Sequence, residues 1–263
     1  MAGLIFKPLS NELYSIPKAQ ILFKPLGAEA YELLGDADDV TVTPTVEQTD
    51  RYTNESGIRT KVKTIVTQID AVLAMTLVQL SNTNRALSLL GEATMDTQIA
   101  AVDQIFLIED ADYNDKIYKL PAFEIDPASV VVTDGNVVPV DLVLNVHYRI
   151  DVDAGFIQLI AKPVGSDTDV SVTFDALAVT AEDGRAKIGI ASKTENRGSI
   201  IIRGTNETGP RVLLHLHDVQ LRPSGERSYI SETELDTIAI EGSITRDDTQ
   251  ESGYELGYER LLK

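Results

Sequence analysis

The sequence contains no cysteine and no tryptophan in 263 residues, and aromatic residues make up only 6% of it. Without cysteine, thiol catalysis, thiolate metal sites and a disulfide framework are all excluded. Basic residues are also scarce, because 23 Lys and Arg stand against 41 Asp and Glu, a formal net charge of −18. Affinity for nucleic acid depends mostly on neutralising phosphates, so this balance argues against a DNA-binding protein. No apolar run approaches the roughly 18 residues of a membrane span, and we expect no membrane association.

The length allows one large domain or two small ones, and the charge is spread unevenly along it. Residues 1–27 carry a balance of +2, whereas residues 226–260 carry −7. The basic segment contains a short repeat, since Ile5-Phe6-Lys7-Pro8-Leu9-Ser10 returns as Leu22-Phe23-Lys24-Pro25-Leu26-Gly27. Coincidence explains six similar positions equally well. The functional interpretation is an N-terminal arm, 1–27, whose Phe6, Lys7, Phe23 and Lys24 contact a neighbouring subunit.

Strand-forming residues dominate the first half of the chain. Residues 39–49 are rich in Val and Thr and predict a strand, followed by a polar loop over 49–60. Residues 61–80 alternate with period two, and their apolar face includes Leu73, which predicts a long strand. A helix starting at Ile69 is the alternative, because good helix formers follow it. Residues 81–90 predict a short helix that ends at a C′ glycine, Gly91.

The second half of the chain also reads as strands. Residues 148–160 show a hairpin pattern with Asp153-Ala154-Gly155 at the bend. Further strands are predicted over 129–133, 137–144, 169–176, 199–203, 211–221 and 235–245. Alternation turns Val170, Val172 and Phe174 inward, and it gives 235–245 an apolar face with Ile238, Ile240 and Ile244 opposite a face with Leu235, Thr237, Ala239, Glu241 and Ser243. No stretch alternates strands and helices as βαβ units do. The predicted class is therefore mainly β with one short α-helix.

Chemical motifs are few. His215-Leu216-His217 puts two imidazoles on one strand face, which holds a metal when a third ligand joins, but such a pair is more often the polar face of an amphipathic strand. The acidic loop from Asp110 fails the EF-hand template, which needs Gly and Glu where this chain has Asp115 and Pro121. No nucleophile elbow, phosphate loop or dinucleotide fingerprint occurs. We expect no enzyme activity, no metal and no cofactor.

The order of these elements resembles one family. The strand with Val40-Thr41-Val42-Thr43-Pro44, the loop 49–60, the strand 61–80 and the helix 81–91 are similar to tail tube (major tail) proteins of long-tailed bacteriophages of the siphophage type. The segments 212–221 and 235–245, joined through Arg222-Pro223-Ser224-Gly225-Glu226, resemble the last two strands of that family. Together these blocks cover about half of the chain.

The resemblance implies a tail-tube β-sandwich or barrel subunit with a flanking helix and a central β insertion. A tube-forming domain would comprise 28–105 and 181–263, and an inserted or outer β subdomain would comprise 106–180. Subunits would assemble into hexameric rings, each lending four strands to a closed barrel, and the rings would stack into a hollow tube through which DNA passes. Closure would pair the exposed strand edges.

Site residues follow from this resemblance. The charged loop would stack ring on ring, and polar positions of two strands would face the lumen, where a negative wall lets DNA slide. The ring-stacking candidates are Asp50, Arg51, Tyr52, Asn54, Glu55 and Arg59. The lumen-facing candidates are Thr64, Gln68, Asp70, Thr237, Glu241 and Ser243, and a register error of one residue would turn all of them outward.

Partners and location are likewise implied. The chain would bind itself and meet a tape measure protein, a tail terminator and baseplate or tail-tip proteins, while phage DNA passes without specific binding. It would be a virion structural protein, assembled in the cytoplasm of the bacterial host. The main alternative is an acidic β-sandwich binding or adhesion module with calcium as its candidate ligand. A carbohydrate hydrolase on a β scaffold is third, and the absence of Trp argues against it.

Overall fold

The computed structural model describes residues 13–55, 57–233 and 235–262, and the fold is mainly β, with 50% strand and 4% helix. Contacts divide the chain into two compact units. Unit 1 contains the residues up to Ala93 and those from Ile188 onward, and unit 2 is Thr94–Lys187. Unit 2 is thus longer at both ends than the expected insertion, 106–180. At the N-terminal end, unit 2 is longer because residues 101–105 pair with strand β11, Val170–Ala176, inside this unit.

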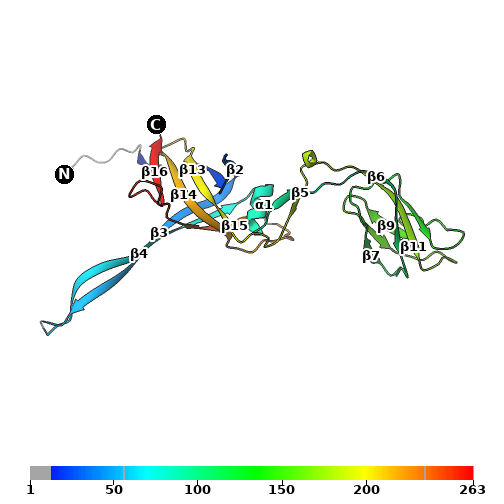
Figure 1. The fold of residues 1–263 in the computed structure, drawn as a ribbon, viewed down its shortest axis with the longest axis horizontal. Helices are drawn as coiled ribbons and strands as arrows, with labels where there is room; N and C mark the ends of the chain where they lie inside the picture. Colours follow the sequence, from blue (N-terminus) through cyan, green and yellow to red (C-terminus); the bar gives the residue numbers. More distant parts are fainter. Residues whose placement is uncertain (1–12, 56, 234, 263) are drawn as a thin grey trace, which may run out of the picture. The chain divides into compact units, whose positions relative to one another are not determined.

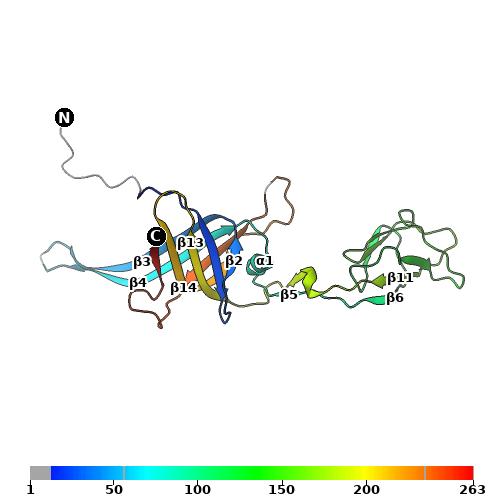
Figure 2. The same ribbon diagram turned by 90° about the horizontal axis from the view of Figure 1, so that it is seen from above.

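Unit 1 is built on one antiparallel sheet with the strand order β2-β1-β13-β14-β15-β4-β3. A further strand, β16, pairs with the first half of β14, while β15 pairs with its second half. Figures 1 and 2 show β13 and β14 side by side at the centre of this sheet. The strands are β1 Ala19–Pro25, β2 Glu32–Gly35, β3 Ala37–Thr53, β4 Thr60–Leu77, β13 Asn196–Gly204, β14 Arg211–Pro223, β15 Ile238–Ile244 and β16 Gly257–Leu262. Among the described residues no sheet closes into a barrel.

One apolar face of this sheet forms the core of unit 1. Leu73, Met75 and Leu77 of β4 are buried there, and the alternating Ile238 and Ile240 of β15 join them. Side chains from β1, β2, β13, β14 and the helix complete the cluster. Period-two alternation in the sequence therefore correctly marks the inward side of β15 and of residues 72–77 in β4.

The short helix α1, Asn82–Ser88, begins where expected, because the Ser81 side chain caps it by accepting a hydrogen bond from Asn84 N. Asn84 is fully buried, and its Nδ2 donates to the carbonyls of Leu34 and Gln79 at 2.7 Å each. The helix end differs from the prediction. Leu90, with φ of 48°, occupies the left-handed position, not Gly91. A glycine is required at 91 because a Cβ there would lie 1.9 Å from the carbonyl oxygen of Gly189.

Strands β3 and β4 form one long hairpin. Half of the predicted loop 49–60 is strand, since β3 continues to Thr53 and β4 begins at Thr60, and the rest is the turn between them. Strand β4 ends at Leu77 instead of residue 80, and the alternative helix from Ile69 does not form. Cross-strand pairing with β3 over the whole of β4 accounts for the strand, overriding the local helix propensity of Ala71, Leu73 and Ala74.

Unit 2 is a sandwich of two three-stranded antiparallel sheets, β6-β11-β8 and β7-β10-β9. Its core includes Val170, Val172 and Phe174, the residues that the alternation over 169–176 turns inward. The predicted hairpin is also present, with β9 and β10 joined by a turn in which Gly155 has φ of 70°. The strands are β6 Ala101–Ile108, β7 Lys116–Lys119, β8 Val131–Asp134, β9 Tyr148–Asp151, β10 Phe156–Leu159 and β11 Val170–Ala176.

The predicted strand 137–144 is wrong. This segment makes two isolated bridges, Thr133–Asp141 and Leu144–Tyr148, and otherwise runs as irregular chain. The buried carboxylate of Asp134 accepts a hydrogen bond from Val140 N at 2.7 Å, which satisfies a backbone donor that a ladder would otherwise use. Pro139, next to it, has no N–H to give to a sheet.

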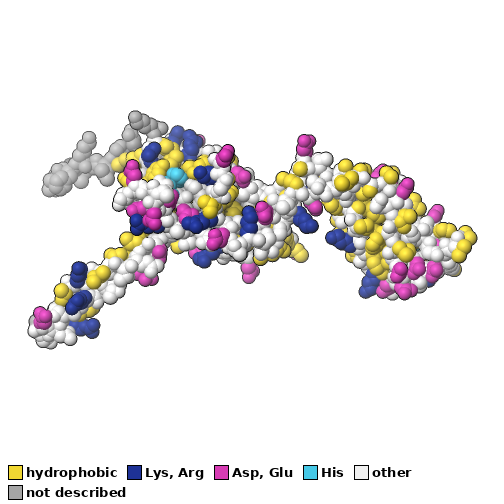
Figure 3. All heavy atoms as spheres, viewed as in Figure 1, with side chains coloured by type: hydrophobic (Ala, Val, Ile, Leu, Met, Phe, Trp, Pro, Cys, Tyr) yellow, Lys and Arg dark blue, Asp and Glu magenta, His cyan; other side chains and the backbone are white. Residues whose placement is uncertain are grey.

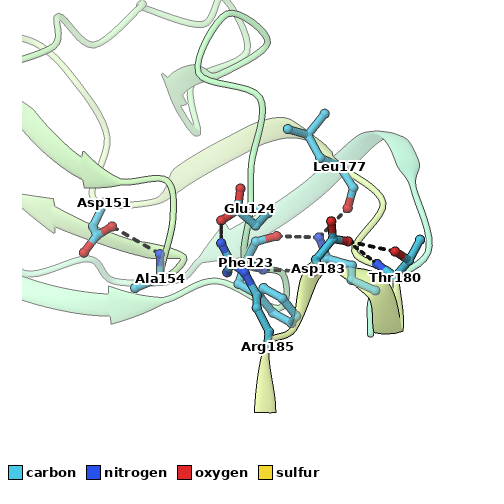
Figure 4. A network of polar contacts seen from close by, with 9 residues as sticks. Phe123, Glu124, Asp151, Ala154, Leu177, Thr180, Asp183 and Arg185 are labelled. Atoms are coloured by element: carbon cyan, nitrogen blue, oxygen red, sulfur yellow. Dashed lines mark hydrogen bonds and ion pairs between the residues drawn. The ribbon is translucent and has the colours of Figure 1, made fainter. Parts of the chain in front are cut away.

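Polar contacts tie the loops at one end of unit 2 together (Figure 4). Glu124 forms an ion pair with Arg185, whose guanidinium also lies 5.9 Å from the centre of the Phe123 ring. Asp183 accepts a hydrogen bond from Thr180 N at 2.6 Å, which closes a short 3-10 turn, Ala181–Asp183. The segments that lead into and out of this unit, β5 Ala93–Met95 and β12 Ala186–Ile188, pair as a two-stranded sheet.

Candidate assembly surfaces

The outer face of β3, β4, β15 and β14 is polar and uncovered, and we call it the open face. Cross-strand partners in an antiparallel sheet lie on the same side, so the register defines this face. One row crosses all four strands through Thr41, Ala74, Glu241 and Arg222. The next row is Thr43, Val72, Ser243 and Gln220. Between them runs the row Val42, Leu73, Gly242 and Leu221, which faces the core on the other side.

Carboxylates outnumber cations on the open face. As far as the pairing shift beyond Glu47, its charged residues are Asp39, Glu47, Asp70, Glu241 and Arg222, as their cross-strand partners show; past that shift Arg51 and Lys63 lie on the same side. Arg222 Nη2 lies 3.1 Å from Glu241 Oε1, so this pair neutralises itself. The remaining three carboxylates leave this part of the face negative, a property that disfavours tight contact with phosphates.

The predicted lumen residues do not all share this face. Gln68, Asp70, Glu241 and Ser243 lie on it, and Gln68 Nε2 donates to the Asp70 carboxylate. Thr64 lies on the opposite side, because the pairing shifts between Glu47–Gln68 and Gln48–Val66. This β-bulge adds one residue to β4 and reverses the alternation beyond it. Thr237 lies one residue before β15 and is half-buried.

Sequence reasoning missed the contributions of β3 and β14 to the open face. The alternations Thr41-Val42-Thr43 and Gln220-Leu221-Arg222 are visible in the sequence, and they mark which side of each strand is polar. Knowing that both strands flank β4 and β15 requires the sheet order, which no local pattern contains.

Beyond Ala71, the β3–β4 hairpin leaves the sheet as a two-stranded ribbon, which we call the ribbon, residues 44–71 (Figure 1). Strand β15 pairs with β4 only from Val72 to Leu77, and every described residue from Thr60 to Asp70 is exposed. Several large apolar side chains on the ribbon have exposed fractions of 43–74%, as Figure 3 also shows along its length. They are Val46, Tyr52, Ile58, Val62, Ile65, Val66 and Ile69.

The ribbon tip is basic in an acidic protein. Residues 51–63 contain Arg51, Arg59, Lys61 and Lys63 but only Glu55 as an acid, a formal charge of +3. Within the predicted loop, 49–60, both signs occur as expected, since Asp50 and Glu55 accompany Arg51 and Arg59. Lys61 Nζ and Thr64 Oγ1 each lie 2.7 Å from Asp50, and these hydrogen bonds lower the pKa of its carboxyl.

The remaining predicted stacking residues occupy the tip itself. Arg51 and Tyr52 belong to β3, and the Arg59 guanidinium lies 4.7 Å from the centre of the Tyr52 ring. Asn54 and Glu55 are in the turn, where the Asn54 carbonyl accepts a hydrogen bond from Gly57 N. The six candidates therefore gather at one end of the ribbon, on both sides of the turn.

The predicted arm is partly a strand of the subunit's own sheet. Residues 19–25 form β1 in the sheet interior, and Phe23 is 2% exposed within the core of unit 1. Phe23 is therefore a core residue, and its assignment as an anchor for a neighbouring chain is wrong. Lys24 points to the other side of β1, as alternation requires. Phe6 and Lys7 lie outside the described residues.

Metal and membrane sites were also sought in the described part of the chain. No group of three or more His, Asp or Glu side chains is arranged there to hold a metal ion. Within the same residues, no helix combines the length and apolar character needed to cross a membrane.

Comparison with known families gives one match. A family model with the description "Protein of unknown function UCP028589" matches residues 19–258. A search of curated proteins found no significant match. The matched range includes both units and every strand except the end of β16.

Proposed function

The chain belongs to the family described as protein of unknown function UCP028589, and since that description names no activity, we propose a function from the geometry of unit 1. We propose that the protein is a structural subunit of a phage-type tail tube, in which six copies form a ring and rings stack into a hollow conduit. The resemblance of strand order and helix position to tail tube proteins supports this proposal, together with the features argued below.

The observation that carries the proposal is the ribbon. An isolated two-stranded hairpin is marginally stable in water, and this one exposes large apolar side chains along its length. Exposed apolar surface on a regular element is typical of protein–protein contact. Its basic tip favours an acidic partner, and further copies of this chain, each with a net charge of −18, offer that chemistry. The ribbon would therefore reach a subunit in the adjacent ring.

The open face supports the second half of the proposal. In a ring, β14, β15, β4 and β3 of each subunit would line the bore, with the core side of the same sheet turned outward. Strand β3 is an edge strand of 17 residues, and an unpaired edge of that length invites pairing with another chain. A polar, negative wall would let DNA pass without holding its phosphates. The tape measure, terminator and tail-tip proteins are partners of this arrangement by family resemblance.

Size-exclusion chromatography combined with negative-stain electron microscopy of the concentrated, purified protein tests the proposal. Hollow rings or stacked tubes are the expected result. The competing function is an acidic β-sandwich binding module, favoured by unit 2, a complete sandwich that carries 17 acidic and 6 basic residues. A stable monomer with a melting temperature that rises when calcium is added would favour that module over the tube.

A further inference from the structure

A cavity of about 530 Å³ lies on the outer side of β1, β13 and β14 in unit 1. The turn after β1 and the loop 246–250 border it. The side chains that converge on it are Lys24, Tyr31, Arg197, Ser199, His215 and His217, and we call it the His215 pocket. Its volume is within the range of small-molecule sites. The tube proposal makes no use of it.

Hydroxyl groups and an imidazole form a continuous network in this pocket. Ser199 Oγ lies 2.9 Å from His215 Nε2 and donates to the Leu216 carbonyl at 3.1 Å. The Tyr31 hydroxyl is 3.1 Å from Ser199 Oγ and 3.3 Å from His215 Nε2. On the other side of the ring, the Tyr258 hydroxyl is 3.4 Å from His215 Nδ1. Because the Ser199 proton is engaged by a carbonyl, this network does not prepare a nucleophile.

The carboxylates that border the pocket are already satisfied. Arg197 binds Asp218, with Nε donating at 2.6 Å, and Arg246 Nε lies 2.6 Å from Asp248. Asp247 accepts hydrogen bonds from Thr249 and Gln250, which lower its pKa to about 2. Asp218 and Asp248 are therefore paired with arginines, whereas Asp247 is held by neutral donors, and its charge interacts with His217.

Lys24, His215 and His217, in contrast, form no ion pair with a described residue. Among the described residues, no carboxylate is within ion-pair distance of Lys24 Nζ, which lies 5.2 Å from the centre of the Tyr31 ring. The rings of His215 and His217 are 4.5 Å apart, and His217 Nε2 is buried without a hydrogen-bond partner. One ammonium, two imidazoles and a phenol thus surround a space in which Asp247 is, among the described lining residues, the one carboxylate without an arginine partner.

We propose that the His215 pocket binds a phosphate group, either as free phosphate or as a small phosphate monoester. A phosphate offers several strong acceptor oxygens, which match donors that approach from β1, β13 and β14. Charge-assisted hydrogen bonds from Lys24 Nζ and from His217 Nε2, which has no partner of its own, would supply most of the affinity, and protonation of His215 would add positive charge. The cavity is larger than one phosphate, so the remaining volume admits the organic part of a monoester.

Binding would be coupled to histidine protonation. Burial lowers the pKa of His215, and the nearby His217 and Lys24 lower it further. A bound dianion would favour the imidazolium and raise that pKa. The charged and titratable groups facing His215 are Lys24 from β1, Tyr31 from the following loop, Arg197 from β13, His217 and Asp218 from β14, Asp247 from the 246–250 loop and Tyr258 from β16.

Equilibrium dialysis of the full-length protein with radiolabelled inorganic phosphate tests the proposal, whether or not the protein assembles. We expect saturable binding near pH 6, and about tenfold weaker binding in Lys24→Gln. Lys18→Gln is the matched control, because it removes the same charge from an exposed site just before β1. Competition with unlabelled glycerol 3-phosphate distinguishes the two sources. If glycerol 3-phosphate displaces the bound label at a lower concentration than unlabelled phosphate does, the ligand is a monoester. If it needs a higher concentration, the ligand is free phosphate.

Histidine titration by NMR gives a second readout that needs no variant. Phosphate should raise the pKa of His215 relative to chloride at equal ionic strength, and leave the titration of His147 unchanged, because His147 belongs to unit 2. The proposal is overturned by absence of saturable binding at about 10 mM phosphate. Equal losses in Lys24→Gln and Lys18→Gln, or equal shifts at all three histidines, overturn it as well. None of these results bears on ring or tube formation.

Discussion

At the residue scale, His215 links the stability of unit 1 to pH. Its pKa is lowered by burial first, then by the charges of His217 and Lys24. A base whose pKa is lower in the folded state takes up a proton more readily when unfolded. Its contribution to stability is therefore complete above the unfolded value of 6.5 and is lost as pH falls through the lower folded value.

We accordingly expect the urea midpoint of unit 1 to fall between about pH 7.5 and pH 5.5, and to fall less in His215→Gln. The comparison is made in chloride, without phosphate. His147→Gln is the control, because it removes a histidine from unit 2 only. Identical pH dependence in the wild type and His215→Gln would contradict the assignment.

Asp70 is the residue that tests the open face directly. It is exposed, it lies on the same side as Glu241 and Ser243, and it has no cationic partner among the described residues. Asp70→Lys is expected to leave tube assembly intact and to slow DNA delivery in an infectivity assay, since a cationic ring would hold phosphates. Asp153→Lys makes the same charge change in an exposed turn of unit 2. Normal DNA delivery by tubes of Asp70→Lys would contradict the assignment of the open face to the bore.

Asn84 is the residue on which the helix–sheet junction depends. Its buried amide serves the carbonyls of Leu34 and Gln79, so Asn84→Ala leaves both without their donor. We expect a loss of about 2–3 kcal/mol in the free energy of unfolding, measured by urea denaturation. Asn82→Ala in the same helix is the control and should cost much less, because Asn82 is only half-buried. Equal costs would show that helix propensity, not the amide, is responsible.

At the element scale, shortening the ribbon tests ring stacking without disturbing the fold of unit 1. Glu47 and Gln68 face each other across the hairpin, so an Asn-Gly turn can replace residues 48–67 without disturbing the sheet. The free energy of unfolding should change by less than about 1 kcal/mol, because the removed side chains are mostly exposed. Electron microscopy should then show single rings, and tubes of normal length would end the stacking role of the ribbon.

A substitution series distinguishes apolar contact from chain length. Val62→Ser with Ile69→Ser should weaken stacking, since both side chains are 61% exposed on the ribbon. Val137→Ser with Val138→Ser removes a similarly exposed apolar pair from unit 2 and is the control. Shorter tubes in both double variants would point to a general loss of solubility or folding.

Strand identity and most strand faces were predictable at this scale, and the face was wrong only beyond the bulge in β4. Alternation identified β4, β11, β14 and β15, and the pair of polar and apolar faces on β15 is correct. It placed Thr64 with Gln68 and Asp70, which is wrong, because a bulge between them reverses the alternation. A bulge is fixed by the partner strand as well as by the bulged one, and no signal in residues 61–70 reveals it.

At the scale of the whole molecule, unit 2 can be deleted from the chain without interrupting the sheet of unit 1. Gly189 N donates to the Glu92 carbonyl at 3.2 Å, so the chain enters and leaves unit 2 at neighbouring points. Replacing residues 94–187 by about four Gly and Ser residues should leave unit 1 folded and able to assemble, because each unit has its own core. Circular dichroism, chromatography and electron microscopy of this variant make the test. Aggregation of the variant, or rings that form only with unit 2 present, would contradict it.

The sequence by itself determined the mainly β class, the short capped helix, the unit 2 hairpin and the inward residues of its main strand, because these depend on neighbours within a few positions. Only the tertiary structure decided that residues 19–25 form an interior strand, that β14 divides its edge between β15 and β16, and that four polar strand faces join into one. It also brought Lys24, Ser199 and His215 together in one pocket. These arrangements come from contacts between segments far apart in the chain, such as Tyr31 and His215, which are 184 residues apart. Local alternation carries no information on which strands meet.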